Sequence, residues 1–233
     1  MSDDDERARI GDMSETRGVP EHPGMGPTHR LEALVDGVFA IVMTIIVIEI
    51  QLPRGQASNL LALLGQNAPT LLGYGLVFIT LGTIWFGNRT QNDFARFADH
   101  PYVWFNLLML MLVAFVPYTA NLLAHYPTER VAVVTYGIHM TAIGLVDGSL
   151  WLYLTFHPWL LHPGLTRYYL SHSRLPAYTV GIGFGIATLI GLAWPVAGLV
   201  AYLLVPIPYI SGLYYRWLTS LARSGADREE ASE

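Results

Sequence analysis

Long apolar runs are the feature that most constrains this chain, because each is long enough to span a membrane as a helix. A span needs roughly 20 consecutive apolar residues. Six stretches qualify, at about 31–51, 66–87, 102–124, 131–156, 176–194 and 196–218. Of the 233 residues, 52% are hydrophobic and 13% are charged, a balance typical of polytopic membrane proteins. The sequence predicts an all-α membrane protein with six transmembrane helices.

Polar or proline-containing segments separate these runs. The expected breaks are Pro53–Gly55, Asn88–Asp99, His125–Pro127 and 157–175. The fifth and sixth spans meet at Trp194-Pro195 with almost no linker, so five or seven spans remain alternatives. Residues 1–29 and 220–233 are polar, and we expect disordered cytosolic tails on either side of a transmembrane domain at 30–219.

Arginine counts indicate the orientation of the spans. All 13 basic residues are Arg and none is Lys, which suggests a GC-rich bacterial coding background. With six spans, 11 Arg fall on one side of the membrane and 2, Arg54 and Arg130, on the other. The positive-inside rule then predicts a multi-pass protein of the bacterial plasma (inner) membrane with both termini in the cytosol.

The first span carries two ionisable groups at positions where burying a charge in lipid costs free energy. Arg30 stands at its entrance and Asp36 about two turns inside. At about 100° per residue, Ile41, Ile45 and Ile48 share one face, whereas Asp36 falls on the opposite side. The acid and the isoleucine face therefore cannot serve the same surface.

Two interpretations of this helix remain open from its residues alone. In the first, symmetry copies of the helix surround an axis, which either the isoleucine face or the Asp36 face lines. In the second, the isoleucine face is an ordinary lipid-facing or packing surface, and Asp36 is a structural acid paired with Arg30 or a neighbouring amide. Thr44, at the edge of this face, either holds water or a partly hydrated cation, or bonds back to its own helix.

The string from Arg30 to Asp36, RLEALVD, is similar to R-x-x-x-F-S-D, the first-helix motif of the transmembrane protein 175 family of potassium channels. Trp85 matches the W of that family's W-x-x-H, and His100-Pro101 with Asn106 matches the opening of the third span. The chain departs from the family at Leu34 and Val35, which replace Phe and Ser, and at Asn88, where His is usual.

The resemblance implies a homotetramer with the first helices around a central pore that conducts cations passively and favours potassium ions. Ile41 matches the constriction isoleucine of the family, and Ile45 and Ile48 match the next pore-facing positions. A ring of isoleucine would pass or block ions through diameter and wetting, so we expect modest selectivity.

The resemblance also implies a polar network behind the pore that ties the first helix to the second and third. Its expected members are Arg30, Asp36, Trp85, Asn88 and Asn106. Since Val35 cannot donate a hydrogen bond and Asn88 cannot acquire a charge, we expect this network to be weaker or differently connected than in the family.

The alternative function is a proton- or cation-coupled secondary transporter. Leu34–Gly37 in the first span recurs as Leu145–Gly148 in the fourth, which would place Asp36 and Asp147 in two inverted halves. Asp147 is itself either a structural hydrogen-bonding group or part of a proton relay.

Other chemistry has little support in the sequence. Without Cys there is no thiol catalysis, and the eight His are scattered without metal-ligand spacing, so we expect no enzyme, metal or cofactor, and no nucleic-acid partner. Gly73-Tyr74-Gly75 lies within a continuous apolar run, where we expect a small-residue helix contact rather than an ion filter. The glycines at 181, 183 and 185 indicate close helix packing.

Overall fold

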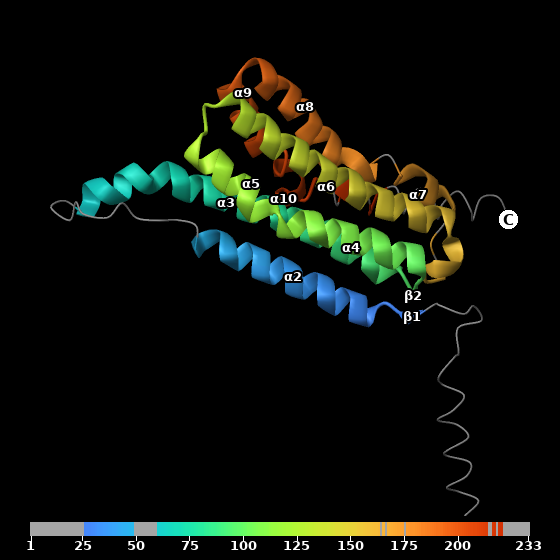
Figure 1. Cartoon of the computed structure of the whole chain (residues 1–233). Coiled ribbons are helices and arrows are strands. Elements are labelled where there is room, and N and C mark those ends of the chain that lie inside the picture. Colours follow the sequence, from blue (N-terminus) through green and yellow to red (C-terminus); the bar gives the residue numbers. More distant parts are fainter. Residues whose placement is uncertain are drawn as a thin grey trace, which may run out of the picture.

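The computed structural model describes residues 26–48, 60–163, 165, 167–174, 176–213, 216–217 and 219–220, which form a bundle of long helices (Figure 1). The main helices are α2 (His29–Ile48), α3 (Leu60–Phe94), α4 (His100–Ala114), α5 (Val116–His125), α6 (Arg130–Phe156), α8 (Thr179–Ala193) and α9 (Pro195–Leu204). Short elements complete the described fold: β1 (Gly26–Pro27), β2 (Phe97–Ala98), η1 (Pro158–Leu160), α7 (Arg167–His172), η2 (Pro176–Tyr178) and α10 (Ile207–Ile210).

Five helical segments are long and apolar enough to cross a membrane. They are His29–Ile48, Thr70–Phe94, His100–His125, Arg130–Phe156 and Tyr169–Ala193. A sixth apolar segment, Pro195–Ile210, is shorter. The described residues therefore support a multi-pass membrane protein with five to six apolar helices, and the sixth span is the one that proline shortens.

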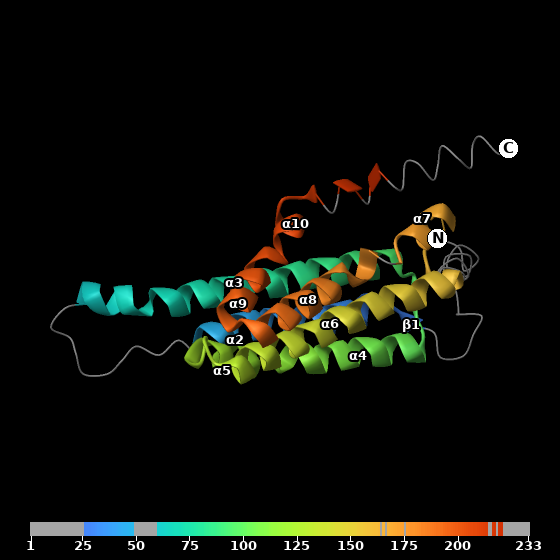
Figure 2. The ribbon, with the colours of Figure 1, turned by 90° about the horizontal axis from the view of Figure 1, so that it is seen from above.

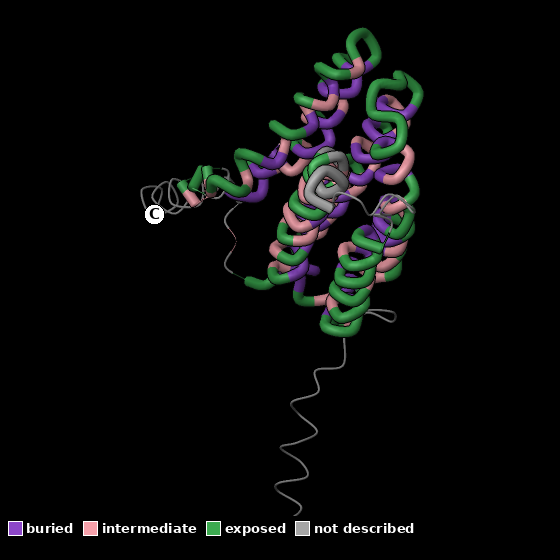
Figure 3. Tube along the Cα trace, turned by 90° about the vertical axis from the view of Figure 1, so that its left-hand side faces the viewer, coloured by how far each residue is buried: buried purple, intermediate pink, exposed green. Residues whose placement is uncertain are grey.

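The helices form layers, and each layer packs against the next. In Figure 1, α2 lies along one side of the bundle, α3, α4 and α5 lie in the middle, and α6 separates them from α8. The view from above shows the N-terminal part of α3 extending beyond the other helices (Figure 2). Buried segments lie where helices face one another, and exposed segments lie outward (Figure 3).

One expected break between spans is wrong in its position. The polar run Asn88–Asp99 does not end the second span, because α3 continues to Phe94. Asn88 is fully buried, and its amide oxygen accepts a hydrogen bond from Asn92 Nδ2 one turn later (3.0 Å). Side-chain amides that bond to each other and to a neighbouring helix can remain inside a span, so the turn occupies only Ala95–Asp99.

The third expected span is broken in the middle into α4 and α5. Pro117 stands in the first turn of α5 and lacks the N–H that a continuous helix needs. The ring of His139, on α6, lies 3.0 Å from the carbonyl oxygen of Leu112 and 2.8 Å from the hydroxyl of Thr119. Its two nitrogens thus satisfy polar groups on both sides of the break, which hydrocarbon could not do.

Glycines allow the closest helix contacts, as the sequence predicted for the fifth span. A Cβ on Gly144 of α6 would lie 2.4 Å from the backbone nitrogen of Gly181 on α8. Gly191 and Gly198 bring α8 and α9 together in the same way across the single connecting residue Trp194. Gly73 and Gly75 lie inside α3, as expected, but a Cβ on either would meet nothing within 4 Å, so the expected helix contact is not seen among the described residues.

Several expectations fall on residues outside the described ranges. These are the tails at 1–25 and 221–233 and the break at Pro53–Gly55. Residues 26–29, which the sequence grouped with the N-terminal tail, form β1 and begin α2.

Candidate functional site

One face of α2 is buried against the rest of the subunit. Residues separated by three or four positions make up this face: Leu31, Val35, Phe39, Val42 and Ile46. They pack against α3, α4 and α5. Since this spacing follows the helical repeat, the burial fixes which side of α2 the rest of the subunit leaves uncovered.

The isoleucine face of α2 is uncovered in the single subunit. Ile41 exposes 58% of its surface and Ile48 exposes 73%, and Ile45 is also exposed. Ile41 and Ile45 line a groove of about 830 Å³ between α2 and α5, with Pro117 and Tyr118 among the residues opposite. An apolar surface of this kind in a membrane protein faces either lipid or another subunit.

Thr44 shares this uncovered side but directs its hydroxyl into its own helix. The hydroxyl lies 2.9 Å from the carbonyl oxygens of both Ala40 and Ile41. The donor is therefore used within α2, and only the lone pairs of the hydroxyl oxygen remain for water or a cation.

Asp36 is bonded to the second span. Its Oδ1 accepts a hydrogen bond of 2.7 Å from the indole Nε1 of Trp85 on α3. The Arg89 guanidinium lies 5.6 Å from the centre of the Trp85 ring, one turn further along α3. Arg30 is exposed and makes no ion pair within the described part of the chain. The structure thus joins Asp36 to Trp85 and not to Arg30.

Asn88 and Asn106 belong to a second polar group, between α3 and α4. Asn88 Nδ2 lies 3.4 Å from the sulfur of Met109, and Asn92 Oδ1 accepts a hydrogen bond of 2.6 Å from the hydroxyl of Tyr102. Asn106 donates to the carbonyl oxygen of Tyr102 in its own helix (2.9 Å). Asn88 with Met109, and Asn92 with Tyr102, hold α3 against α4, whereas the bond of Asn106 stays within α4. Asp36 and Trp85 hold α2 against α3.

Sequence reasoning missed Asn92, Tyr102 and Arg89. The available signal was spacing: Asn92 and Arg89 each follow a predicted network residue by one helical turn, so their side chains share a face. Both lie within Asn88–Asp99, the polar run that the sequence predicts as a break between spans, and there helical spacing is not expected.

The entrance of α2 is held by main-chain pairing. β1 pairs antiparallel with β2, which lies in the turn between α3 and α4. Thr28 Oγ1 adds a longer contact of 3.4 Å to the carbonyl oxygen of Ala95 in the same turn. The polar end of α2 is therefore attached to the segment that links the second and third spans.

Asp147 lies apart from Asp36. It is buried on α6, and the side chains of Asn88 and Gln91 on α3 are its polar neighbours. The two LVDG strings also differ in setting, since Asp36 is exposed at the surface of the subunit. Within the described ranges, no three His, Asp or Glu side chains gather closely enough to hold a metal ion.

Comparisons with known proteins identify the family of this chain. The family described as "Endosomal/lysosomal potassium channel TMEM175" matches residues 30–117, which include α2, α3 and α4. A potassium channel of Streptomyces collinus is 31% identical over 73% of this chain and 84% of its own length. One of Chamaesiphon minutus is 36% identical over 56% of this chain and 68% of its own length.

A solved structure shares the fold. The crystal structure of a lysosomal potassium-selective channel TMEM175 homologue from Chamaesiphon minutus superposes with a TM-score of 0.70 at 26% identity. The match covers 80% of this chain and 97% of that one. With its uncovered apolar face on α2 and the polar contact of Asp36 behind it, this chain belongs to the TMEM175 family, as a prokaryotic-type member.

Proposed function

We propose that this protein is a passive, potassium-favouring cation channel whose pore is lined by α2 from four identical subunits. The observation that carries the proposal is the isoleucine face, which stays exposed although the opposite face of α2 is buried against three helices. The names of the relatives support it, since both bacterial proteins are potassium channels.

In this proposal Ile41 forms the narrowest ring, and Ile45 and Ile48 continue the apolar wall. Such a wall offers no carbonyl or carboxylate oxygen in place of hydration water, so conduction depends on pore diameter and wetting. Thr44 contributes an acceptor oxygen at most, because its hydrogen is bonded within the helix. We therefore propose modest selectivity for potassium over sodium.

The polar contacts orient the pore helix. We propose that Asp36 and Trp85 hold α2 against α3, and that Asn88 supports α3 through Met109 of α4. Asn106 acts within α4, where it bonds to the carbonyl oxygen of Tyr102, the residue whose hydroxyl reaches Asn92 on α3. Arg30 has no such contact with the described residues of its own subunit, so its place in this network is the weakest part of the sequence prediction.

The carrier hypothesis is not favoured. It required Asp36 and Asp147 to act in equivalent halves, but one is exposed and the other is buried in a different place. The relatives are named as channels, and nothing in the described site suggests an enzyme. We place the channel in the bacterial inner membrane with both termini in the cytosol, following the arginine distribution.

The test is ion flux through the purified protein in liposomes, comparing the unmodified chain with Ile41→Asn. A polar ring wets the constriction, so sodium flux rises relative to potassium flux. Ile138→Asn is the matched control, because Ile138 on α6 is 60% exposed and lies outside the proposed pore.

Two results would contradict the proposal. Unchanged flux and selectivity in Ile41→Asn would show that Ile41 does not line the narrow point. Slow, proton-coupled transport by the unmodified chain would replace the channel with a carrier.

A further inference from the structure

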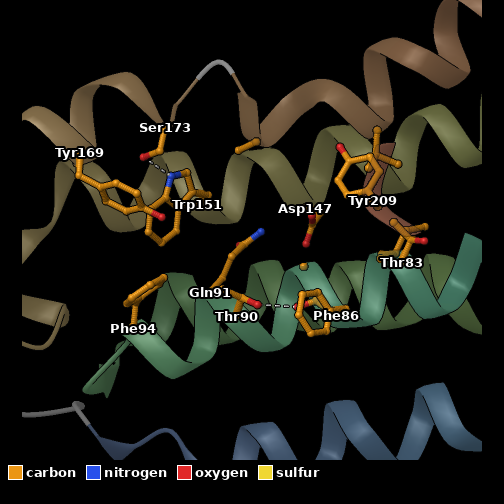
Figure 4. Close-up of a pocket in the computed structure, with 14 residues that line it drawn as sticks. Thr83, Phe86, Thr90, Gln91, Phe94, Asp147, Trp151, Tyr169, Ser173 and Tyr209 are labelled. Carbon is orange, nitrogen blue, oxygen red and sulfur yellow. Dashed lines mark hydrogen bonds between the residues drawn. The ribbon is translucent and has the colours of Figure 1, made fainter. Parts of the chain in front are cut away.

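A small pocket lies inside each subunit, between α3 and α6 and away from the isoleucine face. Its volume is about 110 Å³, and its other side is lined by Tyr169, Ser173, Ala177, Val180 and Tyr209. Figure 4 shows Gln91 and Asp147 pointing into the same space from α3 and α6. This pocket is separate from the groove between α2 and α5, whose lining shares no residue with it.

The pocket contains a buried carboxylate without a counter-charge. Asp147 is 7% exposed, and its Oδ1 has no hydrogen-bond partner among the described residues, although the side-chain amides of Asn88 and Gln91 lie beside the carboxyl group. The Oε1 of Gln91, 8% exposed, is likewise without one. No Arg, Lys or His is among the described residues that line the pocket. Two acceptors buried at membrane depth are costly, and a positively charged donor would satisfy both.

Aromatic rings form the wall beside these acceptors. Phe94 and Trp151 have ring centres 5.8 Å apart, and Tyr169 lies 6.3 Å from each of them. The indole nitrogen of Trp151 donates to Ser173 Oγ (3.0 Å), which fixes the orientation of that ring. Ring faces attract organic cations, and the combination of aromatic rings with a carboxylate recognises ammonium groups.

The volume and the opening of the pocket further limit the class of ligand that it can bind. An engineered apolar cavity of about 150 Å³ binds benzene, so a volume of about 110 Å³ suits one ring or a short chain. An alkali metal ion would need several oxygens to replace its hydration shell, whereas aromatic carbon covers much of this wall. Phe86, one of the lining residues, is 54% exposed in the subunit, so the pocket opens at this side of α3.

We propose that this pocket binds a small lipophilic ammonium ion, with Asp147 as its counter-charge, Gln91 as a second acceptor and the rings of Phe94, Trp151 and Tyr169 as its apolar wall. The pocket lies within one subunit, so the site does not depend on how subunits surround a pore.

The experiment measures binding to the full chain in lipid nanodiscs by titration calorimetry. The probe is benzylammonium, and benzyl alcohol is the uncharged probe of the same shape. We expect saturable binding of one benzylammonium per subunit and at least roughly tenfold weaker binding of benzyl alcohol, because only the cation pairs with the carboxylate.

Two variants test the site from different directions. Asp147→Asn keeps the shape and removes the charge, so benzylammonium affinity falls at least roughly tenfold, as expected when a cation loses a desolvated partner. Gly87→Leu keeps Asp147 but fills the pocket, since a Cβ at Gly87 would already lie 3.8 Å from Asp147 Oδ2. Glu129→Gln, at the exposed start of α6, removes the same charge elsewhere and leaves binding unchanged.

The site is overturned if the unmodified chain shows no saturable benzylammonium binding, or if benzyl alcohol binds equally well. Unchanged binding in either Asp147→Asn or Gly87→Leu overturns it as well. If Asp147→Asn does not assemble, Gly87→Leu decides the question alone, because that change does not alter the carboxylate.

Discussion

At the scale of single residues, the contact between Asp36 and Trp85 shows how a carboxylate is tolerated in the first span. The carboxylate is exposed in the subunit, yet the indole N–H lies 2.7 Å from it. Hydrogen bonds to charged groups contribute about 1.5–3 kcal/mol, roughly twice the value of neutral ones. A residue far along the chain, rather than the nearby Arg30, therefore positions this acid.

Trp85→Phe is expected to lower the thermal stability of the purified protein in detergent. It keeps the ring but removes the donor, so the loss is about 1–2 kcal/mol, given the partial exposure of the pair. Trp104→Phe is the control, because the Trp104 indole donates to His100 on the same exposed helix turn (3.0 Å). An equal loss of melting temperature in both variants would show that the bond to Asp36 has no special role.

At the scale of helices, backbone contacts at glycines decide how closely α6 and α8 approach. Gly144 faces the backbone of Gly181, and the backbone cannot rotate out of the way as a side chain can. Helix association in lipid depends on such packing, because burial from water does not drive it.

Gly144→Ala is expected to destabilise the bundle by about 1–3 kcal/mol, the usual cost of overpacking. Gly73→Ala, in α3, is the matched control: a Cβ there would meet nothing within 4 Å, so this change is neutral or slightly stabilising. Thermal unfolding of the two variants in the same detergent measures the difference. Equal stability of the two variants would mean that α6 and α8 can move apart to admit the added methyl group without lowering the free energy of unfolding.

The helices could be predicted from the sequence to a large extent, and their interruptions could not. The lengths of the apolar runs predict α2, α6 and α8, since a helix must be apolar over roughly 20 residues to cross the bilayer. At the break near Phe115, His139 from another helix contacts the carbonyl oxygen of Leu112 and the hydroxyl of Thr119, and no local pattern records that pairing. The burial of Asn88 depends in the same way on partners in α4.

At the scale of the whole molecule, the proposed tetramer predicts a mass about four times that of the 25.8 kDa chain, measured with bound detergent subtracted.

Because the chain has no Cys, a single introduced thiol reports on one position. Ile45→Cys treated with a short bifunctional maleimide is expected to give covalent dimers, since each subunit offers one thiol to one neighbour.

Leu189→Cys is the control for this cross-link. Leu189 is 69% exposed on α8, on the part of the bundle away from α2, so it gives no covalent dimer. A monomeric mass, or equal cross-linking at both positions, would contradict a pore lined by α2.

The candidate site was partly predictable for a related reason. Helical geometry separated Asp36 from Ile41, and the two have different neighbours in the structure. The role of each residue in conduction stays a prediction. The pocket at Asp147 was not visible in the sequence, because its wall combines α3, α6 and the segment after α7, and only tertiary structure brings them together.

The pairing of β1 with β2 has a mechanical consequence for α2. A rod fixed at one end moves most at the other, and a helix of 20 residues is about 30 Å long. A tilt of about 10° would therefore carry Ile48 through about 5 Å and leave Arg30 almost in place. The pairing of β1 with β2 therefore restrains the Arg30 end of α2, and any tilt of the helix displaces the isoleucines in proportion to their distance from that end.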